Sequence, residues 1–305
     1  MNITELQKAI IEEKEKRNTF ILAHTYQRPE ILDIADLSGD SFALSKAAKN
    51  VPNKRVLLCG VRFMAETVKI LSPEKEVVLS VDDAGCPMAE QIDPLVVKRY
   101  KDTHPTHVIC SYVNTTAALK AVSDICVTSS TAVSIVEKIE STDILFLPDK
   151  NLGAYVQKMV PDKHIHLLDG YCPVHNLVTA QGILECKKKY PNAKVAIHPE
   201  CPIEALEISD MVGSTKDIIQ YAKSSSDEII LVTEKGVYDK LSKEYPNRIF
   251  HQLLPEKMVC ADMKKTALTD VHRALMGEGG TEITIDEPLR LAAKSSIENM
   301  IKYGN

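Results

Sequence analysis

Three cysteines stand at regular positions in this chain and could act together as metal ligands. Cys86, Cys172 and Cys260 are separated by two nearly equal intervals of about 87 residues, and each ends a short segment: VDDAGC, LLDGYC and EKMVC. Such spacing indicates one cysteine per structural repeat. We therefore expect three repeated units, each of which delivers one thiol to a common place.

Soft thiolate ligands without histidines at matching positions favour an iron–sulfur cluster over a zinc ion. A [4Fe-4S] cluster normally takes four cysteines, so three would leave one iron open, as catalytic metal sites do. The alternative is that the three thiols are buried and bind no metal, because the sequence alone does not show that they converge. Most of the other five cysteines lie in apolar or helical segments, where free cysteine packs as a small hydrophobe.

Polar side chains follow one predicted strand in each third of the chain. The segments are FILAHTYQ, THVICSYVN and KVAIHPEC. Ligands of parallel sheets bind outside the carboxyl ends of the strands, so these groups should face one central cavity. They could supply acids, bases and hydrogen bonds, although each one alone could equally be a satisfied strand-end residue. The candidates are His24, Tyr26, Tyr112, Asn114, His198 and Glu200.

A hydroxyl-rich helix start follows each of these strands, in LSGDS, VTSST and VGST. Backbone N–H groups and the helix dipole at such a start can bind phosphate. Taken singly, the same residues are ordinary helix caps. The candidates for a phosphate pocket are Ser41, Ser129 and Thr215.

Strands and helices alternate along the chain, which predicts parallel sheets with right-handed helical crossovers. A second strand and turn recurs as VLLCGVRF, ILFLPDKN and IILVTEKG. The fold class we predict is α/β, with three homologous three-layer domains arranged with pseudo-threefold symmetry around a central site. The expected domains are residues 1–85, 86–171 and 172–260, with 261–305 packing back on the first. Thr4 is expected to cap a helix over residues 4–17.

Composition narrows the class of protein. The 305 residues are 44% hydrophobic and 26% charged, which is ordinary for a globular protein. A net charge of −5 without a basic stripe argues against a nucleic-acid partner. The sequence has no apolar run long enough for a membrane span and no signal peptide at its start, so we expect a cytoplasmic protein with reduced cysteines.

Three further motifs are less specific. His164 and His166, two apart in a predicted strand, would face the same side and could bind a metal, with a surface strand position as the plainer interpretation. His104 and His107 flank a proline in a loop and are assigned no role. GEGG at 277–280 lacks a preceding strand, so it is interpreted as a flexible connector rather than a dinucleotide-binding loop.

Together the motifs resemble those of the quinolinate synthase family over nearly the full length of the chain. The resemblance depends on the three cysteines and on AHTYQRPEILDIAD, GDS at 39–41, GVRFMAETVKIL at 60–71, YVNTTA at 112–117, VTSS at 127–130, PDKNL at 148–152 and IHPEC at 197–201. It implies three α/β domains around an oxygen-sensitive [4Fe-4S] cluster, and a role in the biosynthesis of NAD.

The reaction that this resemblance implies condenses iminoaspartate with dihydroxyacetone phosphate to give quinolinate, with loss of phosphate and two waters. The resemblance to the family also implies that the three cysteines ligate the cluster and that its open iron acts as a Lewis acid. The resemblance implies that Tyr26 and Glu200 transfer protons, and that His24, Tyr112 and His198 bind or polarise the intermediate. It implies that Asn114 contacts a substrate carboxylate. The phosphate pocket would consist of Ser41, Ser129 and Thr215.

Two positions depart from the family pattern. Thr25 stands where asparagine or a bulky aromatic is common, which changes the pocket beside Tyr26 without removing a catalytic group. The C-terminal C-x-x-C-x-x-C of some members is absent.

Two other functions stay open from the sequence. The chain could be an iron–sulfur sensor that binds a phosphorylated metabolite without turnover, although no interaction module is visible. It could also be a metal-free sugar-phosphate enzyme, in which case Cys172→Ser should spare activity. Transient contact with an aspartate-oxidising enzyme would supply iminoaspartate.

Overall fold

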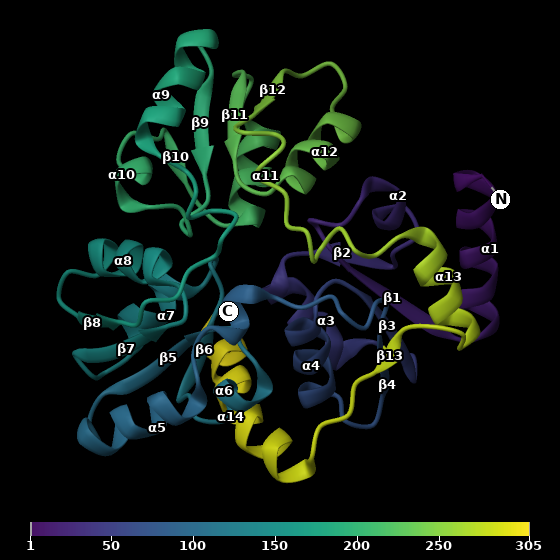
Figure 1. Ribbon diagram of the computed structural model, residues 1–305, viewed down its shortest axis with the longest axis horizontal. Coiled ribbons are helices and arrows are strands. Elements are labelled where there is room, and N and C mark those ends of the chain that lie inside the picture. The colour runs from purple at the N-terminus through teal and green to yellow at the C-terminus, as the bar shows by residue number, and fades with distance from the viewer. Residues whose placement is uncertain (1, 305) are drawn as a thin grey trace.

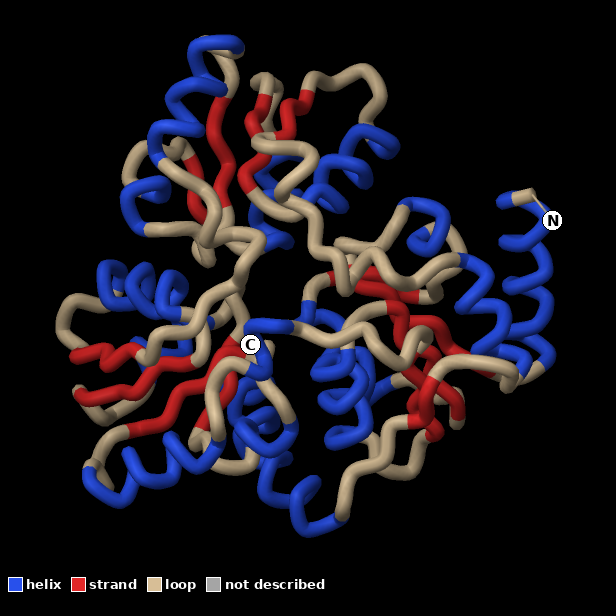
Figure 2. The backbone as a smooth tube through the Cα atoms, in the orientation of Figure 1, coloured by secondary structure: helices blue, strands red, loops and turns tan. Residues whose placement is uncertain are grey.

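Three parallel β-sheets surround the centre of the molecule (Figure 1), in a computed structural model that describes residues 2–304. The strand orders are β13-β4-β3-β1-β2, β6-β5-β7-β8 and β10-β9-β11-β12. Apart from the antiparallel β13, each sheet has the same order, with the first strand of the unit between its second and third strands. Helices and loops separate the three sheets (Figure 2). The prediction of an α/β fold with three repeated sheets is confirmed.

The first unit lies at the right of Figure 1. Its strands are β1 (Thr19–His24), β2 (Leu37–Gly39), β3 (Arg55–Cys59) and β4 (Glu76–Leu79). Its helices are α1 (Ile3–Lys16), α2 (Pro29–Leu32), α3 (Ser41–Asn50) and α4 (Arg62–Leu71). The N-cap of α1 is Asn2 rather than the predicted Thr4, because Asn2 and Glu5 form a reciprocal capping box two residues earlier.

The second unit begins after Cys86 with a short 3₁₀ helix, η1 (Pro87–Glu90). Its strands are β5 (Val108–Tyr112), β6 (Ile125–Val127), β7 (Asp143–Leu147) and β8 (His164–Leu167). Its helices are α5 (Pro94–Thr103), α6 (Ala117–Lys120), α7 (Ala132–Lys138) and α8 (Lys150–Met159).

The third unit, at the top of Figure 1, repeats the plan after Cys172. Its strands are β9 (Lys194–Ile197), β10 (Met211–Val212), β11 (Ile229–Val232) and β12 (Phe250–Gln252). Its helices are α9 (Ala180–Lys189), α10 (Ile203–Leu206), α11 (Thr215–Ser224) and α12 (Lys235–Glu244). The central strand β11, with sequence IILV, is buried along its whole length, as strands covered on both faces are.

The C-terminal segment contacts two of the units. Helix α13 (Leu268–Met276) packs on α1, and β13 (Thr281–Glu282) extends the first sheet beside β4. Helix α14 (Glu287–Tyr303) instead packs against α6 and β6 of the second unit and α4 of the first. The domain boundaries predicted from the sequence stay a prediction.

The GEGG segment, expected to be a flexible connector, forms the turn that connects α13 to β13. Gly277 ends α13 with a φ of 77° and Gly280 has a φ of 73°, both in the left-handed region that glycine adopts without strain. A Cβ at Gly280 would lie 2.8 Å from the carbonyl oxygen of Leu79. The two glycines therefore turn the chain closely enough for β13 to pair with β4.

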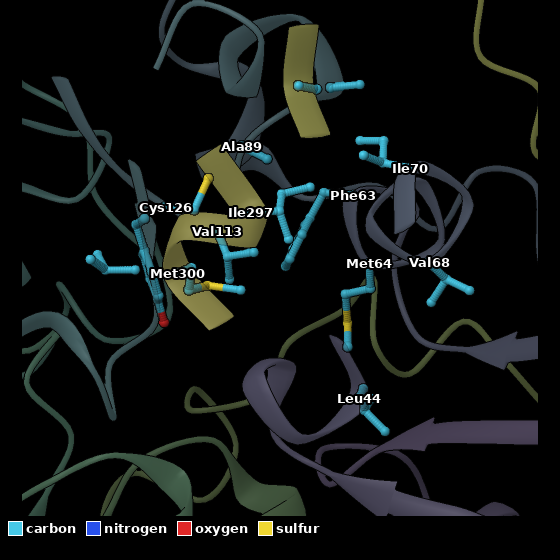
Figure 3. Packing of buried hydrophobic residues seen from close by; sticks show 14 of the residues in the cluster. Leu44, Phe63, Met64, Val68, Ile70, Ala89, Val113, Cys126, Ile297 and Met300 are labelled. Carbon is cyan, nitrogen blue, oxygen red and sulfur yellow. The ribbon is translucent and has the colours of Figure 1, made fainter. Parts of the chain in front are cut away.

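One apolar core joins the first unit, the second unit and α14. Figure 3 shows Phe63 of α4 beside Ile297 of α14, with Val113 of the second unit and Met300 of α14 close to them, and Met64 of α4 belongs to the same core. All five side chains are at most 4% exposed. Their shared packing fixes the first two sheets relative to each other around the centre.

A repeated aspartate defines which residues of the three units are equivalent. Asp36 receives a hydrogen bond from the backbone N–H of Ile21 and returns one from its own N–H to the Ile21 carbonyl. The same double contact links Asp124 with Ile109 and Asp210 with Val195. Counting from Ile21, Ile109 and Val195 therefore aligns the ends of β1, β5 and β9.

Candidate active site

All twelve site residues predicted from the sequence line one central cavity. The space between atoms there, open solvent included, is about 700 Å³, and residues from all three units line it. The lining includes Cys86, Cys172 and Cys260, the strand-end residues His24, Tyr26, Tyr112, Asn114, His198 and Glu200, and the hydroxyl residues Ser41, Ser129 and Thr215. The twelve residues thus lie together, as the sequence predicted. Their roles stay a prediction.

The twelve residues occupy four equivalent positions. Three residues beyond the aligned isoleucine or valine stand His24, Tyr112 and His198; five beyond stand Tyr26, Asn114 and Glu200. Five residues beyond the repeated aspartates stand Ser41, Ser129 and Thr215. The fourth position is the cysteine that ends each unit. Because parallel strands expose their carboxyl ends at one edge, three similar sheets aimed inward bring all these positions to one cavity.

A chain of hydrogen bonds crosses the cavity and links the three units. The Tyr26 hydroxyl lies 2.9 Å from Thr215 Oγ1 and 3.2 Å from Thr233 Oγ1. Thr233 Oγ1 lies 3.1 Å from His175 Nε2, and His175 Nδ1 lies 2.7 Å from Glu200 Oε2. The Tyr112 hydroxyl donates to Glu200 Oε1 at 2.5 Å. These groups can hold or pass protons between the first, second and third units.

His24 and His198 are neutral hydrogen-bond donors rather than acids. Burial lowers the pKa of each imidazole to about 3. The backbone N–H of Tyr26 donates to His24 Nδ1 at 3.1 Å, and that of Glu200 donates to His198 Nδ1 at 3.4 Å. The proton of each neutral ring therefore stands on Nε2, which leaves one N–H to bind a polar group of a substrate.

The carboxyl and the phenols of the cavity differ in protonation. Burial by itself raises the pKa of Glu200, but interactions with His198 and His175 outweigh it and hold that pKa below the ordinary range. Burial raises the pKa of Tyr26 and of Tyr112 well above 10. At neutral pH the cavity thus combines an ionised carboxylate with two protonated phenols, which is a base and acid pairing.

Buried carboxylates position two of the three cysteines. Asp149 caps α8 through the N–H of Leu152 and also accepts the backbone N–H of Cys172 at 3.0 Å. Glu234 caps α12 and accepts the backbone N–H of Cys260 at 3.2 Å. Both carboxyl side chains are fully buried.

The three thiols are protonated in the metal-free protein. Burial raises the pKa of Cys86 to about 12 and of Cys260 to about 11, and raises that of Cys172 well above its usual value. Cys86 is within electrostatic reach of Cys260, and Cys172 of Cys86. Because thiolate is the form that binds a metal, any metal that binds here must displace these protons.

The donor set includes a cysteine-containing group that could bind a metal. Within residues 2–304, the ligand atoms of Cys172, His175 and Glu200 lie within 4.8 Å of one another. Cys86 and Cys260 line the same cavity but are not part of that close group. A single ion would therefore engage one thiol, whereas all three could serve a group that spans the cavity.

Several residues of this site escaped the sequence interpretation. His175, Thr233, Asp149 and Glu234 complete the network and hold the cysteines, yet none was singled out. For His175 a clue was present, since it follows Cys172 by three residues within CPVH. For the carboxylates the clue was an acidic residue at the start of the helix after the third strand, in LPDKN and VTEKG.

Comparison with known proteins assigns the chain to a family. A family model described as quinolinate synthetase A protein matches residues 8–302. This chain belongs to that family. Its members are enzymes of NAD biosynthesis, which agrees with the resemblance seen in the sequence.

Named relatives are similar over their whole lengths. A quinolinate synthase of Clostridium acetobutylicum is 46% identical over 98% of this chain and 98% of its own. One of Clostridioides difficile is 44% identical over 96% of each chain, and one of Caldicellulosiruptor bescii is 44% identical over 100% of each. In the region from Asn2 to Gly304 no helix is both long and apolar enough to cross a bilayer.

Proposed function

We propose that this protein is a quinolinate synthase that condenses iminoaspartate with dihydroxyacetone phosphate, releasing phosphate and two waters. The observation that supports this most is the single cavity in which a thiol, a hydroxyl and two polar strand-end positions recur from each unit. A small anionic substrate pair needs a closed site with several hydrogen-bond donors, and the cavity supplies them. The enzyme is expected in the cytoplasm, with iminoaspartate delivered by an aspartate-oxidising enzyme.

The cavity fits an iron–sulfur cluster held by Cys86, Cys172 and Cys260. Their thiols come from three separate units, and Cys86 lies within electrostatic reach of both Cys172 and Cys260. Soft sulfur ligands favour iron–sulfur clusters. A [4Fe-4S] cluster bound by three cysteines supplies an open iron as Lewis acid. His175 and Glu200 lie beside Cys172 and offer polar contacts there.

Proton transfer falls to Tyr26 and Glu200. The ionised Glu200 carboxylate, held by His175 and by the Tyr112 hydroxyl, accepts a proton from a substrate carbon or nitrogen. The protonated Tyr26 hydroxyl, held between Thr215 and Thr233, donates a proton to a leaving oxygen. Both kinds of transfer are needed for the isomerisation and the two dehydrations.

Binding and orientation fall to the remaining groups. Ser41 and Thr215 are the first residues of α3 and α11, where backbone N–H groups and the helix dipole favour a phosphate. Ser129 adds a third hydroxyl from the second unit. Asn114 Oδ1 is buried without a hydrogen-bond partner, which suits a site that is completed by a ligand.

The test is quinolinate formation by anaerobically purified protein supplied with both substrates. Glu200→Gln should lower turnover about 10³-fold while dihydroxyacetone phosphate still binds, because the amide keeps the shape and loses the base. The matched control is Glu204→Gln, an exposed acid on α10, which should retain activity. Binding of dihydroxyacetone phosphate without any turnover by the unaltered protein would instead support the metabolite sensor.

A further inference from the structure

A second group of metal-binding side chains lies at the opposite ends of the strands from the cavity. It comprises His107 just before β5, Asp143 at the start of β7, and His164 and His166 of β8, with Tyr100 and His104 at the end of α5 beside them. The sequence offered two separate histidine pairs: His164 and His166 could bind a metal, with a surface strand position as the plainer interpretation, and His104 and His107 were assigned no role. The fold brings the pairs together.

Strand register places these side chains in a row. Val108 pairs with Ile144, so the residues before them, His107 and Asp143, lie side by side at the edge of the sheet. Asp143 pairs with His164 on the next strand. Paired residues of neighbouring strands point to the same face, and His166 follows His164 by two residues on that face. The row is therefore a consequence of the backbone of the sheet and not of loop conformation.

The ligand atoms are close enough to share one ion. Asp143 Oδ1 lies 3.3 Å from His164 Nδ1 and 3.4 Å from His166 Nε2. The rings of His107 and His166 are nearly parallel, with centroids 4.8 Å apart. One ligand atom each from His107, Asp143 and His166 can be chosen within 4.8 Å of one another. Tetrahedral zinc with bonds of about 2.0 Å needs ligand atoms about 3.3 Å apart, which small side-chain rotations provide.

The surroundings suit a neutral imidazole ligand. The Tyr100 hydroxyl lies 2.8 Å from His107 Nδ1 and can accept its proton, which leaves Nε2 free for a metal, as outer partners of metal-bound histidines do. Lys101 is the nearby cation, and it is engaged by the His107 carbonyl and by Asp124.

We propose that His107, Asp143 and His166 form a site for one divalent transition-metal ion of the zinc class, with His164 as an alternative nitrogen ligand. Two imidazoles and a carboxylate are the ligands that zinc takes where it keeps an open position. An ion here ties β5, β7 and β8 together at the end of the sheet remote from the cavity. It therefore stabilises the second unit without entering the reaction.

The test is equilibrium dialysis of Zn²⁺ against untagged, cluster-loaded protein under anaerobic conditions. The visible absorbance of the cluster, followed in parallel, reports any zinc that enters at the cysteines instead. We expect one zinc ion per chain with the absorbance unchanged, and at least tenfold weaker binding in His107→Ala and in Asp143→Asn. The matched control is His272→Ala, a histidine on α13, which should bind zinc as the unaltered protein does.

A second measurement keeps the proposal testable if either variant proves unstable. Zinc should raise the melting temperature of the unaltered protein and of His272→Ala but not of His166→Gln, because binding to the native state alone stabilises it. Quinolinate formation should be equal in all of these proteins. Absence of zinc binding to the unaltered protein, or equal binding in all the variants, would overturn the proposal.

Discussion

The second and third units hold their cysteines with buried carboxylates, whereas the first unit holds Cys86 through its backbone. Asp149 and Glu234 stand two residues beyond β7 and β11, and the residue two beyond β3 is Val61. All three are helix N-caps, but Val61 forms no side-chain cap. Near Cys86 the contacts are backbone ones, from the N–H of Arg62 to the Ala84 carbonyl and from that of Ala89 to the Cys86 carbonyl.

This difference shows that the side chain at the N-cap after the third strand can vary among the three units. Burial, and then the charge of Glu200, raises the pKa of Asp149, so carboxylates around the cavity already oppose one another. A third one at position 61 would add negative charge where anionic substrates are proposed to bind. Val61 instead joins Phe63 and Met88 in an apolar wall of the cavity. The three units share the same backbone arrangement, and the side chain at this N-cap differs with its surroundings in the cavity.

The largest expected difference in stability and iron content is between variants at Asp149 and at its first-unit counterpart, Val61. Asp149→Ala leaves the buried N–H groups of Leu152 and Cys172 without acceptors, which should lower the free energy of unfolding by about 3 kcal/mol and release iron. Val61→Ala removes two methyl groups and should lower it by about 1.5 kcal/mol with iron retained. Denaturant unfolding and iron analysis measure both. Equal iron loss in the two variants would remove the distinction.

Substitution of Glu234 should lower the free energy of unfolding by less than substitution of Asp149. Glu234→Gln keeps an oxygen for the Cys260 N–H but leaves the Lys264 ammonium, 3.2 Å away and 14% exposed, without its counter-ion. We expect a loss of about 2 kcal/mol in the free energy of unfolding. The double variant Glu234→Gln with Lys264→Met should recover part of it. Additive losses in this double-mutant cycle would show that the two groups are independent.

Low pH should destabilise the first and third units, because each has a buried histidine at the same repeat position. His24 and His198 have a pKa of about 3 when folded and about 6.5 when unfolded, so the unfolded chain binds more protons as pH falls below 6.5. The stability they contribute is complete above that pH and is lost progressively toward pH 3. By pH 4.5 each should account for a loss of about 3 kcal/mol.

The second unit, with Tyr112 at that position, lacks this contribution. Replacing His24 or His198 by glutamine should flatten the dependence of melting temperature on pH between 6.5 and 4.5. His272→Gln serves as the control, since it lies outside the cavity. An unchanged slope in both cavity variants would contradict the assignment of buried, neutral rings.

The smallest effects should be equal among the units. Asp36→Asn, Asp124→Asn and Asp210→Asn each weaken the contact with one strand and the ion pairing with lysine, which involves one lysine at Asp36 and Asp124 and two at Asp210. Each should lower the free energy of unfolding by about 1 kcal/mol. Denaturant midpoints of the three variants measured side by side test the equivalence, and a loss above 3 kcal/mol in only one unit would break it.

The repeat and the location of the site were accessible from the sequence because both depend on spacing. Regular cysteines, and polar residues at the ends of apolar runs, specify which residues meet at the carboxyl edges of three sheets. Thr233 was not accessible in this way, since its contact with Tyr26 depends on how the third unit packs against the first, and the only sign of His175 was its place three residues after Cys172. The metal-binding row at β5, β7 and β8 needed the strand register, which pairs residues far apart in the chain.

Helix ends and the C-terminal turn were predicted less well. The capping box at Asn2 competes with the one expected from Thr4, and reciprocal contacts with Glu5 decide between them. The strand β13 has two residues and no apolar pattern, so only its pairing with β4 reveals it.

The most direct test measures iron and acid-labile sulfide per chain in anaerobically purified protein and in Cys86→Ser, Cys172→Ser and Cys260→Ser. About four irons and four sulfides should be present in the unaltered protein and be lost or depleted in every one of the three variants, because each unit contributes one ligand to a shared cluster. Full iron and sulfide in any one variant would contradict the convergence of the three thiols, and a colourless unaltered protein after anaerobic reconstitution would contradict the cluster itself.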